Sequence, residues 1–166
     1  MSNFKTADLS DELDGKARVC APLFRDFGGR RKFCGQIATV KCFEDNSKVR
    51  EMLSESGDGK VLVVDAGGSE RCAMLGDQLA QKAVFNGWSG IVMHGYIRDS
   101  ADIAKMSVGV KAMGTHPVKS VKRDLGDVEV PVSFGGVEFI PGDMLYADED
   151  GVLVVPSDTA PEGSCN

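Results

Sequence analysis

The stretch Lys60-Val61-Leu62-Val63-Val64-Asp65 is a continuous apolar run that stops at Ala66-Gly67-Gly68. A run that is apolar at successive positions is typical of a strand covered on both faces of its sheet. A second buried strand is expected from Gly90 to His94, after a segment with helical spacing. Because helical and strand patterns alternate in this way, the sequence predicts an α/β layer architecture.

Further elements are expected on both sides of this run. A helix that ends at Ser56 follows Asp45 or Asn46, either of which can cap it. Apolar residues recur at helical spacing from Cys72 to Asn86, and Asp99 opens a short helix from Ser100 to Lys105. Strands are expected at 33–43, 108–113, 128–134, 137–140 and 151–155, so the chain is β-rich beyond Gly126.

The length of 166 residues fits one domain, with 42% hydrophobic and 27% charged residues as in an ordinary globular chain. We expect a single compact domain over 1–155 and a polar, disordered tail over 156–166.

The charge balance disfavours direct binding to nucleic acid. Nineteen Lys and Arg against 25 Asp and Glu give a net charge of −6, whereas a phosphate-backbone binder needs clustered cations. The longest apolar run is far shorter than the roughly 20 residues that span a bilayer, and the first residues do not resemble a signal peptide. A cytoplasmic protein that does not bind membranes is expected.

The five cysteines are odd in number and form no C-x-x-C pair. Reduced thiols in a reducing compartment are therefore expected, with Cys34 and Cys42 as buried apolar residues of a strand. Cys165, on the polar tail, is expected to be exposed.

Candidate chemistry gathers at two loops. Gly76-Asp77-Gln78-Leu79 lies near the start of a predicted helix, where free N–H groups favour a substrate carboxylate, although Asp77 can instead offset the helix dipole itself. Arg98 and Asp99 follow the next strand, and loops after strand ends line the crevice of parallel α/β sheets. A structural ion pair for Arg98 and a helix cap for Asp99 are the alternatives.

The pairing of Arg98 with Asp99 favours a metal-binding site over a structural ion pair and a helix cap. Carboxylate oxygens suit Mg²⁺ or Mn²⁺, which often use one or two protein carboxylates plus water and substrate. An adjacent arginine suits a reaction that develops an oxyanion. His94 and His116 show no metal spacing and are interpreted as structural.

Two other motifs carry weaker signals. Glu44-Asp45-Asn46 could contribute an acid to a site, although capping explains Asp45 or Asn46 without chemistry. The glycines after Asp65 resemble the first motif of nucleotide and S-adenosylmethionine binders, but they do not repeat at the spacing that a dinucleotide fingerprint needs.

Nearly the whole chain resembles the family that unites the regulator of ribonuclease E activity A with the class II 4-hydroxy-4-methyl-2-oxoglutarate aldolases. The segments that carry the resemblance are Thr6–Leu9, Phe27–Arg30, Cys34–Asn46, Gly76–Ala80, Asn86–Trp88 and Phe134–Val137. The resemblance implies a swivelling β/β/α fold that assembles as a ring-shaped homotrimer with clefts at the subunit interfaces.

The aldolase signature of this family is an Asp, twenty residues, then Arg-Asp, with an acid three residues later. It falls here on Asp77, Arg98, Asp99 and Asp102. The resemblance implies that Asp99 binds a divalent metal cation, that Arg98 binds a 2-oxo acid substrate, and that the backbone of Gly76 to Leu79 holds the substrate carboxylate. Arg98, Asp77 and Asp102 are the expected catalytic residues.

The implied reaction cleaves a hydroxylated 2-oxo acid to pyruvate, and oxaloacetate decarboxylation would pass through the same enolate. The longer aldolases of the family carry a C-terminal extension that helps complete a neighbour's site, whereas here a short tail follows Val155. That difference places the sequence closer to the regulator branch. The alternative is therefore a non-catalytic inhibitor of ribonuclease E, whose acidic surface faces basic segments of the enzyme.

Overall fold

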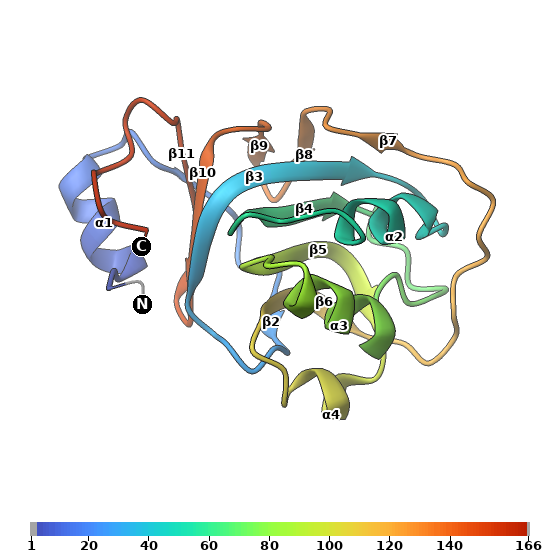
Figure 1. Ribbon diagram of the computed structural model, residues 1–166. Helices are drawn as coiled ribbons and strands as arrows, with labels where there is room; N and C mark the ends of the chain where they lie inside the picture. The colour runs from blue at the N-terminus through green and yellow to red at the C-terminus, as the bar shows by residue number, and fades with distance from the viewer. Residues whose placement is uncertain (1–2, 166) are drawn as a thin grey trace.

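A computed structural model describes residues 3–165 (Figure 1). The helices are α1 (Thr6–Leu13), α2 (Ser47–Leu53), α3 (Asp77–Phe85) and α4 (Ser100–Ile103). The strands are β1 (Arg18–Val19), β2 (Arg25–Asp26), β3 (Phe33–Lys41), β4 (Val61–Asp65), β5 (Gly90–Ile97), β6 (Gly109–Thr115), β7 (Asp127–Val128), β8 (Val132–Phe134), β9 (Val137–Phe139), β10 (Met144–Asp148) and β11 (Gly151–Val155). The expected mixed α/β single domain is confirmed.

Strand β3 joins the two halves of a sheet with the order β1-β11-β10-β3-β4-β5-β6-β2. The first residues of β3 pair antiparallel with β10, as in Cys34 opposite Tyr146. From Ile37 onward the same strand pairs in parallel with β4, and β5 and β6 continue in parallel. The carboxyl ends of β3 to β6 therefore meet at one edge of the sheet, which is where the polar loops lie.

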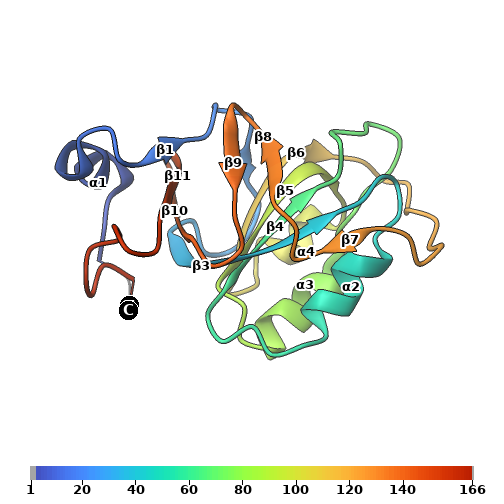
Figure 2. The ribbon, with the colours of Figure 1, turned by 90° about the horizontal axis from the view of Figure 1, so that it is seen from above.

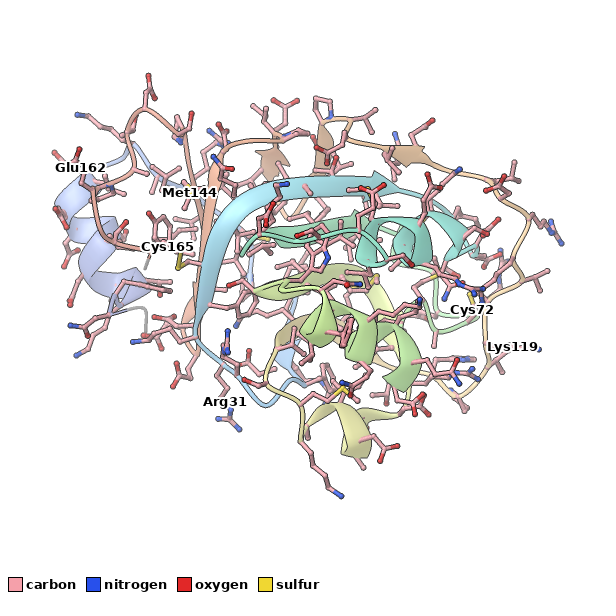
Figure 3. All side chains as sticks on the ribbon, in the orientation of Figure 1. Arg31, Cys72, Lys119, Met144, Glu162 and Cys165 are labelled. Carbon is pink, nitrogen blue, oxygen red and sulfur yellow. A yellow bond between two sulfur atoms is a disulfide. The ribbon has the colours of Figure 1, made fainter. Side chains whose placement is uncertain are left out.

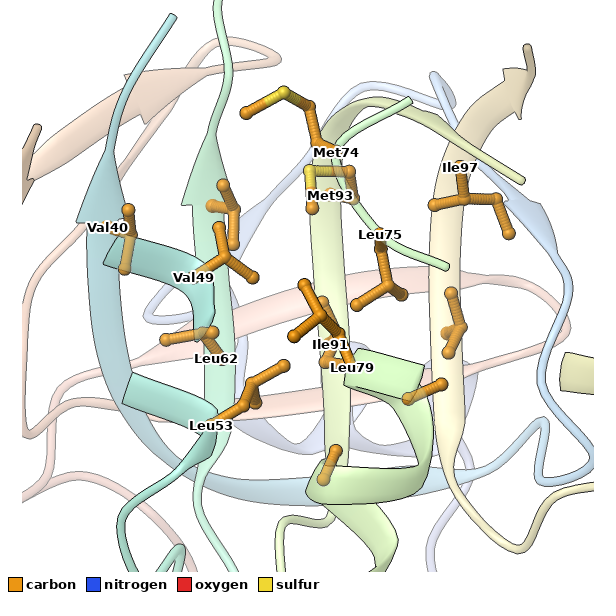
Figure 4. Close-up of a cluster of buried hydrophobic side chains, with 14 of the residues drawn as sticks. Val40, Val49, Leu53, Leu62, Met74, Leu75, Leu79, Ile91, Met93 and Ile97 are labelled. Atoms are coloured by element: carbon orange, nitrogen blue, oxygen red, sulfur yellow. The ribbon is translucent and has the colours of Figure 1, made fainter. Parts of the chain in front are cut away.

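Helices α2 and α3 cover one face of this parallel region (Figure 2). Their apolar residues pack with those of the strands into the largest buried cluster, in which Val49 and Leu53 of α2 lie over Leu62 of β4 (Figure 4). Residues Met74 and Leu75 belong to the same cluster. The two strand runs are apolar at successive positions because their other face is also covered, by the hairpin β8–β9 and residues such as Phe134 and Phe139.

Residues 156–165, the segment predicted as a disordered tail, lie beside α1 (Figure 1). Ala160 and Cys165 lie against a third cluster that includes Leu9, Leu13 and Tyr146, because the amphipathic α1 leaves apolar surface to cover at this end. The Tyr146 hydroxyl lies 2.5 Å from Ser164 Oγ. Within residues 156–165, Ser157, Asp158, Glu162 and Gly163 are exposed and the other residues are partly buried.

A disulfide joins Cys34 in β3 to Cys165, across 131 positions of sequence. The expectation that all thiols are reduced, and that Cys165 is exposed, is therefore wrong, since the returning tail brings Cys165 onto β3. Cys20, Cys42 and Cys72 are free and buried, and this burial was expected for Cys42. Burial raises the pKa of the Cys20 thiol to about 11 and, with nearby carboxylates, that of Cys42 to about 12.

Two sequence expectations about elements also change. The segment 72–76 is not helical, because the N–H groups of Ala73 and Met74 donate to the carbonyls of Val118 and Tyr96 at 2.7 and 2.8 Å. Strand β10 was not predicted at all. Within residues 3–165 no helix is long and apolar enough to cross a bilayer.

Candidate functional site

The site begins where the segment 73–76 turns into α3. Gly76 is the residue before the helix, so α3 starts at Asp77 rather than at Cys72. The first N–H groups of a helix have no partner within it. Asp77 N–H donates to Asp99, and the N–H groups of Gln78 and Leu79 have no acceptor among residues 3–165. Two main-chain donors at the positive end of the helix are thus available to an anion.

Asp99 lies directly against this turn. Its Oδ2 accepts the hydrogen bond from Asp77 N–H at 3.0 Å, while its own backbone is in the left-handed region, with φ of 57°. The side chain makes no capping hydrogen bond to α4. Asp99 does occupy the N-cap position of α4, where its main-chain carbonyl accepts from Ile103 N–H at 3.0 Å, but its carboxylate caps α3 instead.

Gly76 permits this approach. A Cβ atom at position 76 would lie 2.8 Å from Asp99 Oδ2 and 3.5 Å from both Cγ and Nε of Arg98. Its φ of −127° is one that any residue adopts, so the need for glycine here is the space it leaves and not its backbone freedom.

Arg98 is half-buried and follows β5 directly, and its main-chain N–H donates to the Leu75 carbonyl at 2.9 Å. In the described part of the chain its guanidinium takes part in no ion pair. The structural ion pair that was the alternative for Arg98 is not formed. Its five N–H donors are free for a ligand.

These groups line a pocket of about 240 Å³ whose charge is opposite to that of the whole protein. Five cationic side chains and two carboxylates contribute to its lining, on a chain of net charge −6. The cationic residues are Arg50, Lys82, Arg98, Lys119 and Lys122, and the acids are Asp77 and Asp99. None of the five cations makes an ion pair within residues 3–165. The pocket therefore favours an anion of more than one charge.

Asp45 holds the loop that carries Lys119 and Lys122 near the pocket. Burial opposes ionisation of Asp45, but its hydrogen bonds from Ser47 and from the N–H groups of Arg123 and Leu125 outweigh burial. They lower the pKa of Asp45 to about 2. Of the two predicted caps for α2, Asp45 is the one that accepts the hydrogen bond from Ser47 N–H, at 2.9 Å.

Asn46 occupies the N-cap position of α2, but its side chain makes no capping hydrogen bond and lines the pocket instead. Sequence analysis offered it only as a cap or a neighbour of an acid, so its place here was missed. The residue is buried, and its Nδ2 donates to the Met74 carbonyl at 3.2 Å.

Other candidates lie away from the pocket. Asp102 is exposed on α4 and does not line the pocket, so its catalytic role stays a prediction. His94 Nδ1 lies 3.1 Å from Asp65 Oδ1, and its ring stacks on Phe134. These contacts agree with the structural interpretation of His94. They also give the carboxylate of Asp65, beside the glycine turn, a partner within the protein.

A divalent cation at Asp99 would need substrate oxygens and water to complete its coordination. No three His, Cys, Asp or Glu side chains in residues 3–165 are grouped to hold a metal. Asp99 Oδ1, however, has no hydrogen-bond partner there, and Gly76 leaves space beside the carboxylate. A single hard carboxylate of this kind suits Mg²⁺, which keeps much of its water and binds substrate oxygens.

The fold and the pocket together define an α/β protein with a cationic pocket at the start of a helix. Residues 6–154 match the family described as RraA-like, Aldolase/RraA, and the chain belongs to that family.

Curated relatives share more than half of their residues with this chain. A protein of Laribacter hongkongensis is 57% identical over 154 residues, which cover 93% of this chain and 97% of the relative. One of Pseudomonas putida is 53% identical, with 95% and 96% covered. Both bear the name "Putative 4-hydroxy-4-methyl-2-oxoglutarate aldolase". Both relatives are matched over nearly their full length.

Solved structures share the fold and bear different names. One from Geobacillus kaustophilus, titled as an S-adenosylmethionine: 2-dimethylmenaquinone methyltransferase, has 52% identity and a TM-score of 0.91, with 93% of this chain and 96% of that chain covered. The RNA-processing inhibitor RraA from Thermus thermophilus has 44% identity and a TM-score of 0.92, with 97% and 96% covered.

Proposed function

We propose that this protein is a divalent-metal-dependent lyase that cleaves 4-hydroxy-4-methyl-2-oxoglutarate into two molecules of pyruvate and decarboxylates oxaloacetate through the same pyruvate enolate. The observation that carries the proposal is the turn at Gly76, where Asp99 and an unpaired Arg98 lie beside free N–H groups of α3. The names of the curated relatives support the same activity.

In this mechanism the chain binds and polarises a 2-oxo acid. The N–H groups of Gln78 and Leu79 hold the substrate carboxylate at the start of α3. Asp99 would hold the cation, which supplies Lewis acidity toward the 2-oxo group when bound. The guanidinium of Arg98 stabilises the oxygen that becomes negative as the C–C bond breaks.

The two substrates differ in what must leave. With the hydroxylated acid, the C4 hydroxyl loses its proton, the C3–C4 bond breaks, and one pyruvate leaves together with the enolate of a second. With oxaloacetate, carbon dioxide leaves and the same enolate forms. In both cases the enolate takes up a proton to give pyruvate, so Arg98 is needed by both reactions.

The assembly implied by the resemblance, a ring-shaped homotrimer of swivelling β/β/α domains, belongs to this proposal. Arg50, Lys119 and Lys122 line the pocket and are exposed, so a neighbouring subunit could add residues beside them. Light scattering of the purified protein measures the assembly directly, and a monomeric mass would contradict it.

The test of the proposed activity is pyruvate release from each substrate before and after chelation. Purified protein should release pyruvate from both acids, lose that activity in EDTA, and recover it when Mg²⁺ or Mn²⁺ is added in excess. Full activity after chelation would exclude a metal-dependent reaction, and no pyruvate from either acid would exclude the lyase.

A second candidate function is inhibition of ribonuclease E by protein binding. The likeness to the RNA-processing inhibitor RraA of Thermus thermophilus favours it, as does the net charge of −6. Binding to an arginine-rich segment of the endonuclease should weaken as salt rises, because charges are screened beyond about 8 to 10 Å at 0.1 to 0.15 M. No binding at low salt would remove this candidate.

A further inference from the structure

We propose that Asn46 accepts a hydrogen bond from the C4 hydroxyl of the substrate and so makes the pocket selective for hydroxylated 2-oxo acids. This inference rests on the proposed function and assigns a residue to the part of the substrate that oxaloacetate lacks. It starts from a buried polar atom that has no partner in the described chain.

The side chain of Asn46 is fixed before any ligand arrives. The residue is 8% exposed, and its main-chain N–H donates to Ser120 Oγ at 3.3 Å. Its Nδ2 donates to the carbonyl of Met74, two residues before the Gly76 turn. Because a carbonyl only accepts, this contact requires the nitrogen of the amide to face Met74, and the oxygen is then the other atom.

That oxygen, Oδ1, is buried and has no hydrogen-bond partner among residues 3–165. Most buried polar side-chain atoms are hydrogen-bonded, since an unpaired one costs the free energy of its lost hydration. Asn46 lines the same pocket as Gly76, Arg98 and Asp99. A ligand in that pocket is therefore the partner that the geometry provides for Oδ1.

The charge of the pocket decides which ligand group this is. A carbonyl oxygen needs a donor, and carboxylates, which the five cations attract, are acceptors only at neutral pH. A ligand amine would also donate, but its positive charge is disfavoured beside Arg50, Lys82 and Lys119. A hydroxyl on an anionic acid is the donor that satisfies both conditions.

The consequence is a difference between the two proposed substrates. A site that hydrogen-bonds a substrate hydroxyl discriminates against the analogue without it, because the buried acceptor is then left unpaired. Oxaloacetate has no C4 hydroxyl and would leave Oδ1 unpaired. Asn46 is thus expected to strengthen binding of the hydroxylated substrate and to have little effect on oxaloacetate decarboxylation.

The experiment measures binding with a pair of acids that cannot be cleaved. The pair is 2,4-dihydroxyglutarate, the reduced form of the substrate analogue 4-hydroxy-2-oxoglutarate without the 4-methyl group, and 2-hydroxyglutarate, which differs from it only at C4. Calorimetric titrations in Mg²⁺ compare wild type, Asn46→Ala and Asn86→Ala. Asn86 is the matched control, because its Nδ2 also donates to a backbone carbonyl, that of Leu53 at 2.8 Å, outside the pocket.

Wild type and Asn86→Ala should bind one C4 epimer of 2,4-dihydroxyglutarate about tenfold more tightly than 2-hydroxyglutarate, the effect of one hydrogen bond. Asn46→Ala should lose this preference. Equal binding of both acids by wild type, or an unchanged preference in folded Asn46→Ala, would overturn the assignment.

Turnover separates this inference from the proposed function. Asn46→Ala should lower kcat/KM for the hydroxylated substrate by about tenfold or more and change that for oxaloacetate by less than about twofold. An equal loss for both substrates would make Asn46 a structural residue. A wild type that shows the binding preference but releases no pyruvate would remove the lyase and leave Asn46 as a ligand-binding residue.

Discussion

Replacement of Gly76 by alanine tests whether the turn at α3 is built for chemistry rather than for stability. The added Cβ would lie 2.8 Å from Asp99 Oδ2, where an ordinary van der Waals contact needs about 3.4 Å. The carboxylate must therefore move by roughly 0.6 Å, and Arg98, with Cγ and Nε at 3.5 Å, needs little change. The backbone adds no strain, because φ at Gly76 is −127°.

The expected cost differs between folding and turnover. Weakening of the hydrogen bond from Asp77 N–H to Asp99 should lower the free energy of unfolding by no more than about 3 kcal/mol. A misplacement of about 1 Å in a reacting group can reduce a rate by about 10²-fold, so a shift of this size should lower kcat/KM by roughly 10-fold or more.

The assay is pyruvate release from oxaloacetate in saturating Mg²⁺, alongside thermal unfolding. Gln81→Ala is the control, because Gln81 is exposed on the same helix. Gly76→Ala with full activity would show that the position of Asp99 does not matter to catalysis. A large fall in the thermal transition with unchanged turnover per folded molecule would make the turn purely structural.

Three further predictions concern other parts of the molecule. Arg98→Lys should lose about as much activity as Arg98→Ala, roughly 10²- to 10³-fold, because lysine lacks the planar fork that spans two oxygens; near-normal steady-state kinetics for the lysine variant would contradict this. The pKa of Asp45 is lower in the folded state, so its stabilisation should be complete above about pH 4 and decline toward about pH 2. Acid unfolding monitored by circular dichroism should show a weaker dependence in this range for Asp45→Asn than for wild type. Reduction of the disulfide between Cys34 and Cys165 opens a loop of 131 positions. The chain-entropy model gives such a crosslink about 5 kcal/mol of stabilisation, so dithiothreitol should lower the temperature of thermal unfolding strongly. An unchanged unfolding temperature would exclude the bond. Because Lys119 and Cys165 lie at opposite ends of the molecule (Figure 3), turnover below that temperature should not change.

The sequence predicted the parallel core because its signals are local. Apolar runs at Lys60 to Asp65 and Gly90 to His94 mark strands by themselves, and the structure confirms both. Asp77, Arg98 and Asp99 were predicted to converge because loops after parallel strands share one edge of the sheet. The structure adds that Asp99 caps α3, which pairs an N–H and a carboxylate 22 positions apart.

What sequence reasoning missed depends on contacts between distant residues. Met74 has the spacing of a helix, but it is not helical because Tyr96 supplies its hydrogen-bond acceptor. Asn46 has the local pattern of a cap, and only its contact with Met74, 28 positions away, places it in the pocket. The disulfide of Cys165 likewise depends on the return of the tail to β3.

The most direct test of the central claim, that Asp99 holds a catalytic cation, is kcat/KM of Asp99→Asn with oxaloacetate in Mg²⁺. Asparagine keeps an oxygen that accepts from Asp77 N–H, so the cap on α3 and the thermal transition should be retained while the charge is lost. We expect activity to fall by at least about 10²-fold in a protein that unfolds at the wild-type temperature. Activity within about twofold of wild type would show that the reaction does not use a cation at Asp99.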